Sequence, residues 1–169
     1  IVSPLESVSG RFEYIVSNDG VIAIVDYAHT PDALKNVLET INDIKTGHEN
    51  ILTVVGCGGD RDKLKRPKMA HIATQLSTQV IFTSDNPRTE NPQTILEEME
   101  LGVLPENEIK TVTVLNRKQA IKTACKLSKP GDIILIAGKG HENYQEINGV
   151  RSHFDDLEEV QNCFNQLKK

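Results

Sequence analysis

Four short polar segments stand out in the sequence because each follows a run of apolar residues. The segments are 26–29 (Asp-Tyr-Ala-His), 56–62 (Gly-Cys-Gly-Gly-Asp-Arg-Asp), 85–88 (Asp-Asn-Pro-Arg) and 138–142 (Gly-Lys-Gly-His-Glu). If the apolar runs are strands of one open parallel sheet, their carboxyl ends lie at one edge, where such folds bind ligands. We therefore expect the four segments to face one cleft, although loops that merely turn the chain are also polar and glycine-rich.

The side chains in these segments suit a ligand that carries several charges. Arg61 and Arg88 each offer a planar fork of donors that fits a carboxylate or a phosphate. Glu142 offers acceptors for an ammonium group, so the three residues together suit an amino acid with more than one carboxylate. The alternative is that each arginine pairs with a nearby aspartate and only fastens its loop. The candidate partners are Asp60, Asp62 and Asp85.

Other polar residues have structural interpretations. His29 and His141 suit structural hydrogen bonds as well as they suit catalysis. A group of basic residues is expected to form the solvated start of a helix. This group consists of Lys63, Lys65, Arg66 and Lys68.

Two common nucleotide-binding motifs are incomplete. The segment that starts at Gly56 begins like G-x-G-x-x-G, but Arg61 occupies the last glycine position. A P-loop would need a glycine at position 133 and Ser or Thr at position 140, where the sequence has Ile133 and Gly140. Any grip on a nucleoside triphosphate must therefore come largely from outside this chain.

Hydrophobic periodicity predicts the elements that position these segments. Short β-branched runs alternate with amphipathic stretches, which indicates an α/β fold with a mainly parallel sheet flanked by helices. Predicted strands cover 21–25, 51–55, 80–83, 110–115 and 133–137, and the last is central. Predicted helices start at Thr30-Pro31, near Pro67, at Asn91-Pro92, at Asn116 and at Asp155. Asn148-Gly149 predicts an antiparallel hairpin within 144–154, near the C-terminus.

The composition limits the class of protein. The 169 residues suffice for a single domain, and a net charge of −5 argues against nucleic acid as a partner. The longest apolar run, 133–137, is too short for a membrane span. Three separated cysteines predict neither a zinc site nor disulfides, which fits a reducing cytoplasm. Because the chain starts at Ile1 without a signal peptide, we expect a piece of a longer protein.

The polar segments together closely resemble the Mur ligase family. The matching motifs are Gly10-Arg11-Phe12-Glu13, 26–34, 58–62 with Lys65-Arg66-Pro67, 85–88 and 138–142, which cover nearly the whole chain. Enzymes of this family have three domains, and residues 1–169 resemble the third, a Rossmann-like module that closes over a central ATPase domain. The resemblance implies that the N-terminal UDP-binding domain and the central domain lie outside this chain.

The resemblance implies that the chain supplies half of an ATP site. Arg11 matches a family arginine that reaches the ATP phosphates, and Asp26 matches an aspartate that holds the ribose hydroxyls. Tyr27 and His29 would lie beside the nucleotide. Mg²⁺ would be bound mainly by the central domain, and no metal ligand is expected in this one.

The resemblance also implies a site for meso-diaminopimelate. Segment 85–88 matches the motif of members that add this amino acid, with Asn86 and Arg88 at its far end. The residues implied as contacts are Arg61, Asp85, Asn86, Arg88, Gly138 and Glu142. The full enzyme would use Mg-ATP to phosphorylate a carboxylate of UDP-MurNAc-L-Ala-D-Glu, and the amine of diaminopimelate would attack the acyl phosphate. No catalytic residue is expected in this domain, which should be inactive alone.

Three other functions are compatible with parts of the pattern. A lysine-adding ligase of the same family is one, but a substrate that ends in an ammonium group has no use for a cation such as Arg88. A third domain like that of folylpolyglutamate synthetase is another. A module that binds an amino acid without catalysis is the third, and the missing P-loop would suit it.

Overall fold

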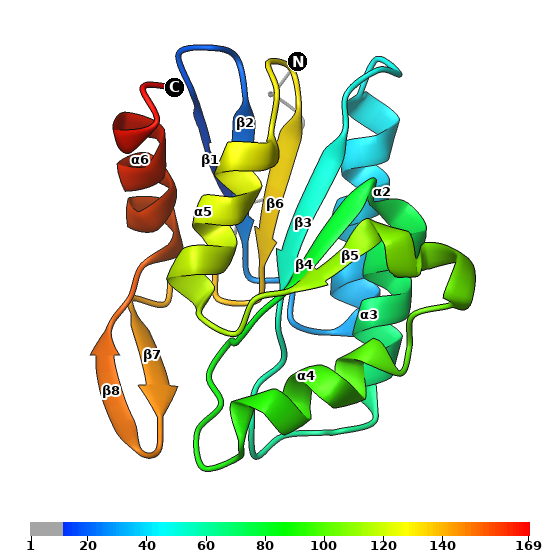
Figure 1. The fold of residues 1–169 in the computed structure, drawn as a ribbon, viewed down its shortest axis with the longest axis vertical. Coiled ribbons are helices and arrows are strands. Elements are labelled where there is room, and N and C mark those ends of the chain that lie inside the picture. Colours follow the sequence, from blue (N-terminus) through cyan, green and yellow to red (C-terminus); the bar gives the residue numbers. More distant parts are fainter. Residues whose placement is uncertain (1–11) are drawn as a thin grey trace.

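A six-stranded sheet forms the centre of the computed structural model, which describes residues 12–169 (Figure 1). Its strands are β1 (Phe12–Val16), β2 (Ile22–Asp26), β3 (Ile51–Val55), β4 (Gln79–Phe82), β5 (Thr111–Thr113) and β6 (Ile133–Ala137). The order is β1-β2-β6-β3-β4-β5, and every pair is parallel except the antiparallel pair β1 and β2. The predicted mainly parallel sheet with an interior β6 is confirmed.

Helices cover both faces of this sheet. They are α2 (Pro31–Ile44), α3 (Lys65–Leu76), α4 (Pro92–Glu100), the 3₁₀ helix η1 (Pro105–Lys110), α5 (Arg117–Leu127) and α6 (Asp156–Gln166). Apolar side chains of α2, α3 and α4 share one buried cluster with the sheet, and those of α5 and α6 share a second on the opposite face. Figure 1 shows α5 in front of the strands and α2 and α3 behind them. No helix in residues 12–169 is long and apolar enough to cross a bilayer.

Local sequence signals account for the helix starts. The side chains of Thr30, Asn91, Asn116 and Asp155 each accept a hydrogen bond from a backbone N–H in the first turn of the helix that follows. Pro31 and Pro92 occupy the first helical position, where a missing N–H costs nothing. All four predicted caps are confirmed.

The predicted hairpin is a separate two-stranded sheet of β7 (Tyr144–Ile147) and β8 (Val150–His153). Its turn residues Asn148 and Gly149 have φ values of 53° and 76°, as a two-residue turn of this kind requires. The hairpin is tied to the loop after β4, because Arg88 N donates to Glu146 O and Asn148 N donates to Arg88 O. It therefore forms one wall of the edge where the polar segments meet.

Several elements differ from the prediction. Strand β1 is not predicted by periodicity, because this edge strand is only partly buried on both faces: Phe12 and Tyr14 pack on one cluster and Ile15 on the other. The helix η1 is likewise not predicted. Helix α3 begins two residues before Pro67, and β5 is shorter than expected. These differences leave the carboxyl edge of the sheet unchanged.

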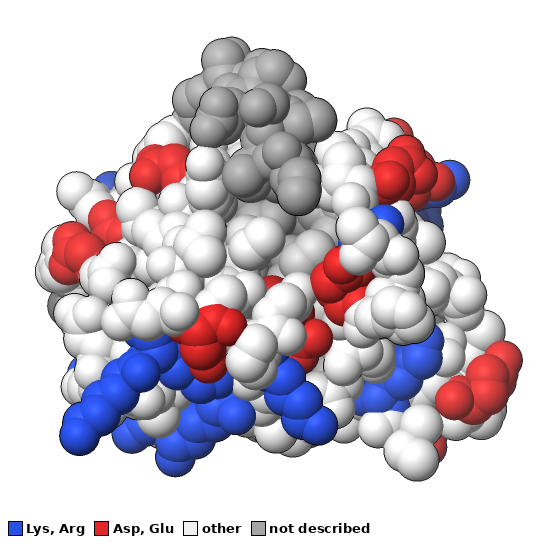
Figure 2. Space-filling model, turned by 90° about the horizontal axis from the view of Figure 1, so that it is seen from above, with Lys and Arg blue, Asp and Glu red and all other residues white. Residues whose placement is uncertain are grey.

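Charged side chains are unevenly distributed at the edge of the sheet that lies opposite the carboxyl ends of the parallel strands. Figure 2 shows this edge from above, with Lys and Arg gathered on the side where α5 lies. Helix α5 carries Lys118, Lys122 and Lys126 at spacings of four residues, which places them on one face. Because α5 begins at the carboxyl edge, where Arg117 Nη1 donates to Ser84 O, this lysine stripe runs along the helix from that edge towards the opposite one.

Candidate functional site

The four polar segments line one cavity of about 590 Å³ at the carboxyl ends of the parallel strands. The lining residues from these segments are Tyr27, His29, Gly58, Arg61, Asp62, Asp85, Asn86, Arg88, Gly138 and Glu142. Thr30, Pro31, Lys65 and Tyr144 complete the lining. The expectation that the segments face one cleft is confirmed, because the parallel strands β2, β6, β3 and β4 end at the same edge.

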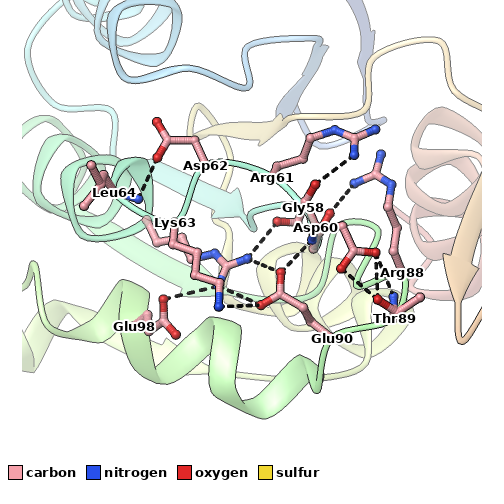
Figure 3. A network of polar contacts seen from close by, with 12 residues as sticks. Gly58, Asp60, Arg61, Asp62, Lys63, Leu64, Arg88, Thr89, Glu90 and Glu98 are labelled. Atoms are coloured by element: carbon pink, nitrogen blue, oxygen red, sulfur yellow. Dashed lines mark hydrogen bonds and ion pairs between the residues drawn. The ribbon is translucent and has the colours of Figure 1, made fainter.

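Arg61 and Arg88 approach each other on one side of this pocket (Figure 3). A Cβ atom placed on Gly58 would lie 2.7 Å from Arg88 Nη1 and 3.7 Å from Arg61 Cγ, so both side chains pass close to that glycine. Arg61 Nη1 donates to Asp60 O, and Arg88 Nη1 donates to Gly59 O, each at 2.9 Å. Both guanidinium groups are therefore held by backbone carbonyls of one loop.

Neither arginine forms an ion pair within residues 12–169, so the predicted Arg–Asp alternative is wrong for this part of the chain. The Asp60 carboxylate accepts instead from the hydroxyl of Thr89, and Asp62 Oδ1 accepts from Leu64 N. Two cations that face one cavity without carboxylate partners raise its positive potential. This arrangement favours a ligand with anionic groups.

A buried lysine of the 138–142 segment, to which the sequence assigned no role, contacts two of the pocket residues. Lys139 is fully buried, and its Nζ donates to Asn86 Oδ1 at 2.9 Å and to Glu142 Oε1 at 3.3 Å. Burial lowers the pKa of Lys139, while Asp85 and Glu142 act in the opposite direction. The signal available in the sequence was a lysine between two glycines directly after the buried strand β6.

Asn86 is committed to other protein groups. Its Oδ1 accepts from Lys139 Nζ and from Glu146 N, and its Nδ2 donates to Glu142 Oε1 at 3.2 Å. The residue is only 1% exposed. Asn86 thus fixes the orientation of Glu142, whose side chain is 24% exposed and lines the pocket.

Gly138 and Asp85 meet closely at the end of β6. Gly138 has φ of 115°, and a Cβ there would lie 2.6 Å from Asp85 Oδ2. Any side chain at position 138 would therefore be strained and would displace the carboxylate. Gln145 Nε2 donates to Asp85 O at 2.7 Å, which ties this loop to the hairpin β7-β8.

The residues expected at the nucleotide gather at the end of β2. Tyr27 and His29 line the pocket with ring centroids 4.5 Å apart, and Lys65 Nζ donates to His29 O at 2.9 Å. Asp26 is buried at the strand end behind them, and its Oδ2 accepts from Ala28 N. Arg11 lies outside the residues that the structure describes.

One residue of the predicted solvated helix start is in fact buried. Arg66 is 0% exposed, and its guanidinium pairs with Glu90 at 2.6 Å and with Glu98 at 3.2 Å. The prediction of a solvated side chain is wrong for Arg66, because it shares the helix stripe of the core residues Met69 and Ala70. The spacing i, i+3, i+4 was the signal that could have identified it. A second buried ion pair, Arg117 with Asp156 at 2.8 Å, joins α5 to α6 and was also not predicted.

Comparisons with known proteins agree with this geometry. A family model described as "Mur ligase, glutamate ligase domain" matches residues 10–140. The chain is 57% identical over 168 residues to a protein of Cytophaga hutchinsonii named "UDP-N-acetylmuramoyl-L-alanyl-D-glutamate--2,6-diaminopimelate ligase". The alignment covers 99% of this chain and 34% of that protein. A protein of the same name from Lactiplantibacillus plantarum is 54% identical, with 95% and 32% covered.

A solved structure has a part with the same fold as this chain. Its title is "Structure of UDP-N-acetylmuramoyl-L-alanyl-D-glutamate--2, 6-diaminopimelate ligase", and the TM-score is 0.87 at 44% identity. The alignment covers 95% of this chain and 32% of that one. This chain therefore spans about a third of the length of the relatives that it matches.

Proposed function

Because the chain belongs to the Mur ligase family, we propose that it is the C-terminal domain of a cytoplasmic ligase that joins meso-diaminopimelate to UDP-MurNAc-L-Ala-D-Glu. Such a ligase works in the synthesis of peptidoglycan precursors. The N-terminal UDP-binding domain and the central ATPase domain would belong to the rest of the protein. The matched relatives support this proposal, since this chain corresponds to about a third of their length.

The observation that carries the proposal is the set of charges in the pocket. Arg61 and Arg88 face the cavity without an ion-pair partner in residues 12–169, and Glu142 lines the same cavity. Meso-diaminopimelate carries two carboxylates and two amino groups. Two arginine forks and a carboxylate complement that pattern, because each guanidinium can donate two parallel hydrogen bonds to a carboxylate.

The charges that line the pocket would favour diaminopimelate over lysine. The two amino acids share one α-amino acid end, and diaminopimelate carries an additional carboxylate at the far end. Arg88 would bind that carboxylate, while lysine would leave the guanidinium without an anion. A site built to bind a polar group rejects an analogue that lacks it by ~10⁴-fold or more.

In the proposed reaction, the γ-phosphoryl group of ATP passes to a carboxylate oxygen of the D-glutamyl residue, and ADP leaves. The amine of diaminopimelate attacks the acyl carbon, and the tetrahedral intermediate expels phosphate while the nitrogen loses a proton. The residues of this chain contribute by positioning the amine and by neutralising charge. Mg²⁺ would be held mainly by the central domain.

The nucleotide would bind at the other end of the pocket. Tyr27 and His29 present two rings at the rim, beside the end of β2 that carries Asp26. The proposal assigns Asp26 to the ribose hydroxyls and Arg11 to the phosphates. In this arrangement the amino acid and the ATP share one cavity, which the central domain would close.

The test is phosphate release by the full-length enzyme with ATP and the muramoyl dipeptide, with either meso-diaminopimelate or L-lysine as acceptor. We expect a strong preference for diaminopimelate in kcat/KM. A preference for lysine would support the lysine-adding ligase instead. Binding of diaminopimelate without any turnover by the full-length protein would support a non-catalytic module.

A further inference from the structure

A partly buried network of ion pairs lies beside the loops that carry the two pocket arginines (Figure 3). Its centre is Arg66 of α3, whose Nη2 donates to Glu90 Oε2 at 2.6 Å and to Gly58 O at 3.1 Å. Its Nη1 donates to Glu90 Oε1 and Glu98 Oε1, each at 3.2 Å. One guanidinium therefore contacts α4, the loop before α4, and the loop after β3.

Glu90 extends the network to the same loop. Its Oε2 accepts from Asp60 N at 2.6 Å, so Arg66 and Glu90 together hold Gly58 O and Asp60 N, on either side of Gly59. A second link joins the loops, because the Asp60 carboxylate accepts from Thr89 Oγ1 at 2.7 and 2.8 Å. The three-residue segment 58–60 is thus held by Arg66 of α3 and by Thr89 and Glu90 of the loop before α4.

Segment 58–60 is also where both pocket arginines are held. Arg88 Nη1 donates to Gly59 O, and Arg61 Nη1 donates to Asp60 O. Asp60 and Arg88 have φ values of 56° and 53°, a left-handed conformation that residues other than glycine adopt at a cost. Surrounding contacts must therefore stabilise this backbone.

Stability alone does not explain such a network. Removing a buried arginine and its partner together, with apolar replacements, is often neutral for stability. A planar guanidinium with several fixed partners does impose a definite geometry on the groups that it joins. Here the joined groups are the carbonyl of Gly58 and the carboxylate of Glu90, which in turn orients Asp60 N.

We propose that Arg66 and Glu90 are positioning residues that set the two guanidinium groups of Arg61 and Arg88 at the spacing required by a dicarboxylic amino acid. Neither residue lines the pocket, so both act through segment 58–60. This inference rests on the proposed function, because it concerns the amino-acid end of the same pocket.

The test uses the full-length enzyme with the variants Arg66→Met, Arg66→Lys and Glu90→Gln. We expect Arg66→Met to lower kcat/KM for meso-diaminopimelate at least tenfold, mostly through KM, and to leave the KM for ATP within twofold. Arg66→Lys keeps the charge but reaches fewer partners, so it should recover part of the loss. Glu90→Gln keeps the shape of the side chain and should raise the KM for diaminopimelate severalfold.

Two matched controls lie on neighbouring exposed positions. Lys68→Met removes a cation from the same helix α3, and Glu97→Gln removes a carboxylate from α4; both side chains are exposed and neither forms an ion pair within the described residues. Both controls should keep the wild-type KM for diaminopimelate within twofold. The melting temperature of each variant separates a positioning effect from unfolding.

Equal losses for ATP and diaminopimelate would overturn the inference, because they would indicate a general structural role. A KM for diaminopimelate that stays within twofold in folded Arg66→Met and Glu90→Gln enzymes would also overturn it. Failure of the proposed function is a different result, since it would appear in the wild type as absence of turnover with diaminopimelate. If Arg66→Met does not fold, the Arg66→Lys and Glu90→Gln variants decide the question alone.

Discussion

Arg61 and Arg88 differ from the buried arginines of the described chain in their partners. Arg66 and Arg117 are each paired with carboxylates, whereas the two pocket arginines donate only to backbone carbonyls. A guanidinium can make several hydrogen bonds, so donors remain for a ligand carboxylate. At the scale of single residues, the proposed specificity of the pocket therefore rests on these two side chains.

Replacing Arg88 with alanine in the full-length enzyme is expected to lower kcat/KM for meso-diaminopimelate about a hundredfold or more. The reason is the loss of two charge-assisted hydrogen bonds, each worth ~1.5–3 kcal/mol. Arg88→Lys keeps the charge without the fork and should recover only part of the activity. Steady-state kinetics with both amino acids measure the effect, with Lys126→Ala on α5 as a control away from the pocket. An Arg88→Ala enzyme with normal diaminopimelate kinetics would contradict the assignment.

Replacing Asp26 with alanine should weaken the use of ATP roughly ten- to a hundredfold, because a charged hydrogen bond to the ribose is lost. The KM for diaminopimelate should change little. Asp26→Asn is the informative control: an amide oxygen can still accept from Ala28 N, so this variant can keep the loop contact while it loses the charge and one acceptor oxygen. Arg11→Ala should likewise affect ATP more than diaminopimelate. Unchanged ATP kinetics in all three variants would remove the nucleotide assignment.

At the scale of elements, the pocket is built from loops that are joined to one another. The loop after β3 is tied to the loop after β4 by Gly59 N donating to Asn86 O at 2.8 Å. The hairpin β7-β8 is tied to the loop after β4 through the backbone of Arg88. The Arg66 side chain of α3 contacts both loops. These links make the carboxyl edge of the sheet a single connected unit rather than four independent loops.

The ion pair between Arg66 and Glu90 depends on pH, because the Glu90 carboxylate must be ionised. The hydrogen bond from Arg66, followed by that from Asp60 N, lowers the pKa of Glu90 to about 2. A glutamate in the unfolded chain has a pKa of ~4.3. The stabilisation of the fold by ionised Glu90 is therefore fully present above that pH and is lost as the pH falls towards 2. The free energy of unfolding of this chain should therefore decrease across that window.

Urea unfolding of this chain at a series of pH values between about 5 and 2 measures the contribution of Glu90. Glu90→Gln should be less stable than the wild type at pH 5, and the difference should shrink as the pH falls. Glu97→Gln serves as the control, because this exposed carboxylate lies on α4 without an ion pair in the described part of the chain. Parallel stability curves for the wild type and Glu90→Gln would contradict the prediction.

At the scale of the whole molecule, the chain has what a domain needs to fold independently. Two apolar clusters cover the two faces of the sheet, and the interior strands β3 and β6 are buried along their full length. The pocket opens at one edge, where the proposed function would place an amino acid and part of a nucleotide. The phosphate-binding loop that activation requires would belong to the central domain.

The isolated chain is therefore expected to unfold cooperatively but to release no phosphate from ATP in the presence of the muramoyl dipeptide and diaminopimelate. Circular dichroism during thermal unfolding tests the first part, and a phosphate assay tests the second. Addition of the separately expressed remainder of the enzyme is a useful comparison. Release of phosphate by this chain alone, dependent on all three substrates, would contradict the division of labour between domains.

The sequence alone determined the order and type of most elements and the meeting of the four polar segments. Strand periodicity and helix caps are local signals, so β3, β6 and the caps Thr30, Asn91 and Asn116 could be predicted from neighbouring residues. The meeting of the segments follows from topology, because all strands of a parallel arrangement end at one edge. The same four polar segments carry most of the motifs that resemble the Mur ligase family.

Only the tertiary structure decided which charged groups are free for a ligand and which are used by the protein. Arg66 pairs with Glu90 across 24 positions, and Lys139 reaches Asn86 across 53. Asn86 is thereby occupied, while Arg61 and Arg88 are left without carboxylate partners in residues 12–169. Residue type and local spacing do not encode such pairings, because burial and partner choice depend on how distant helices and loops pack together.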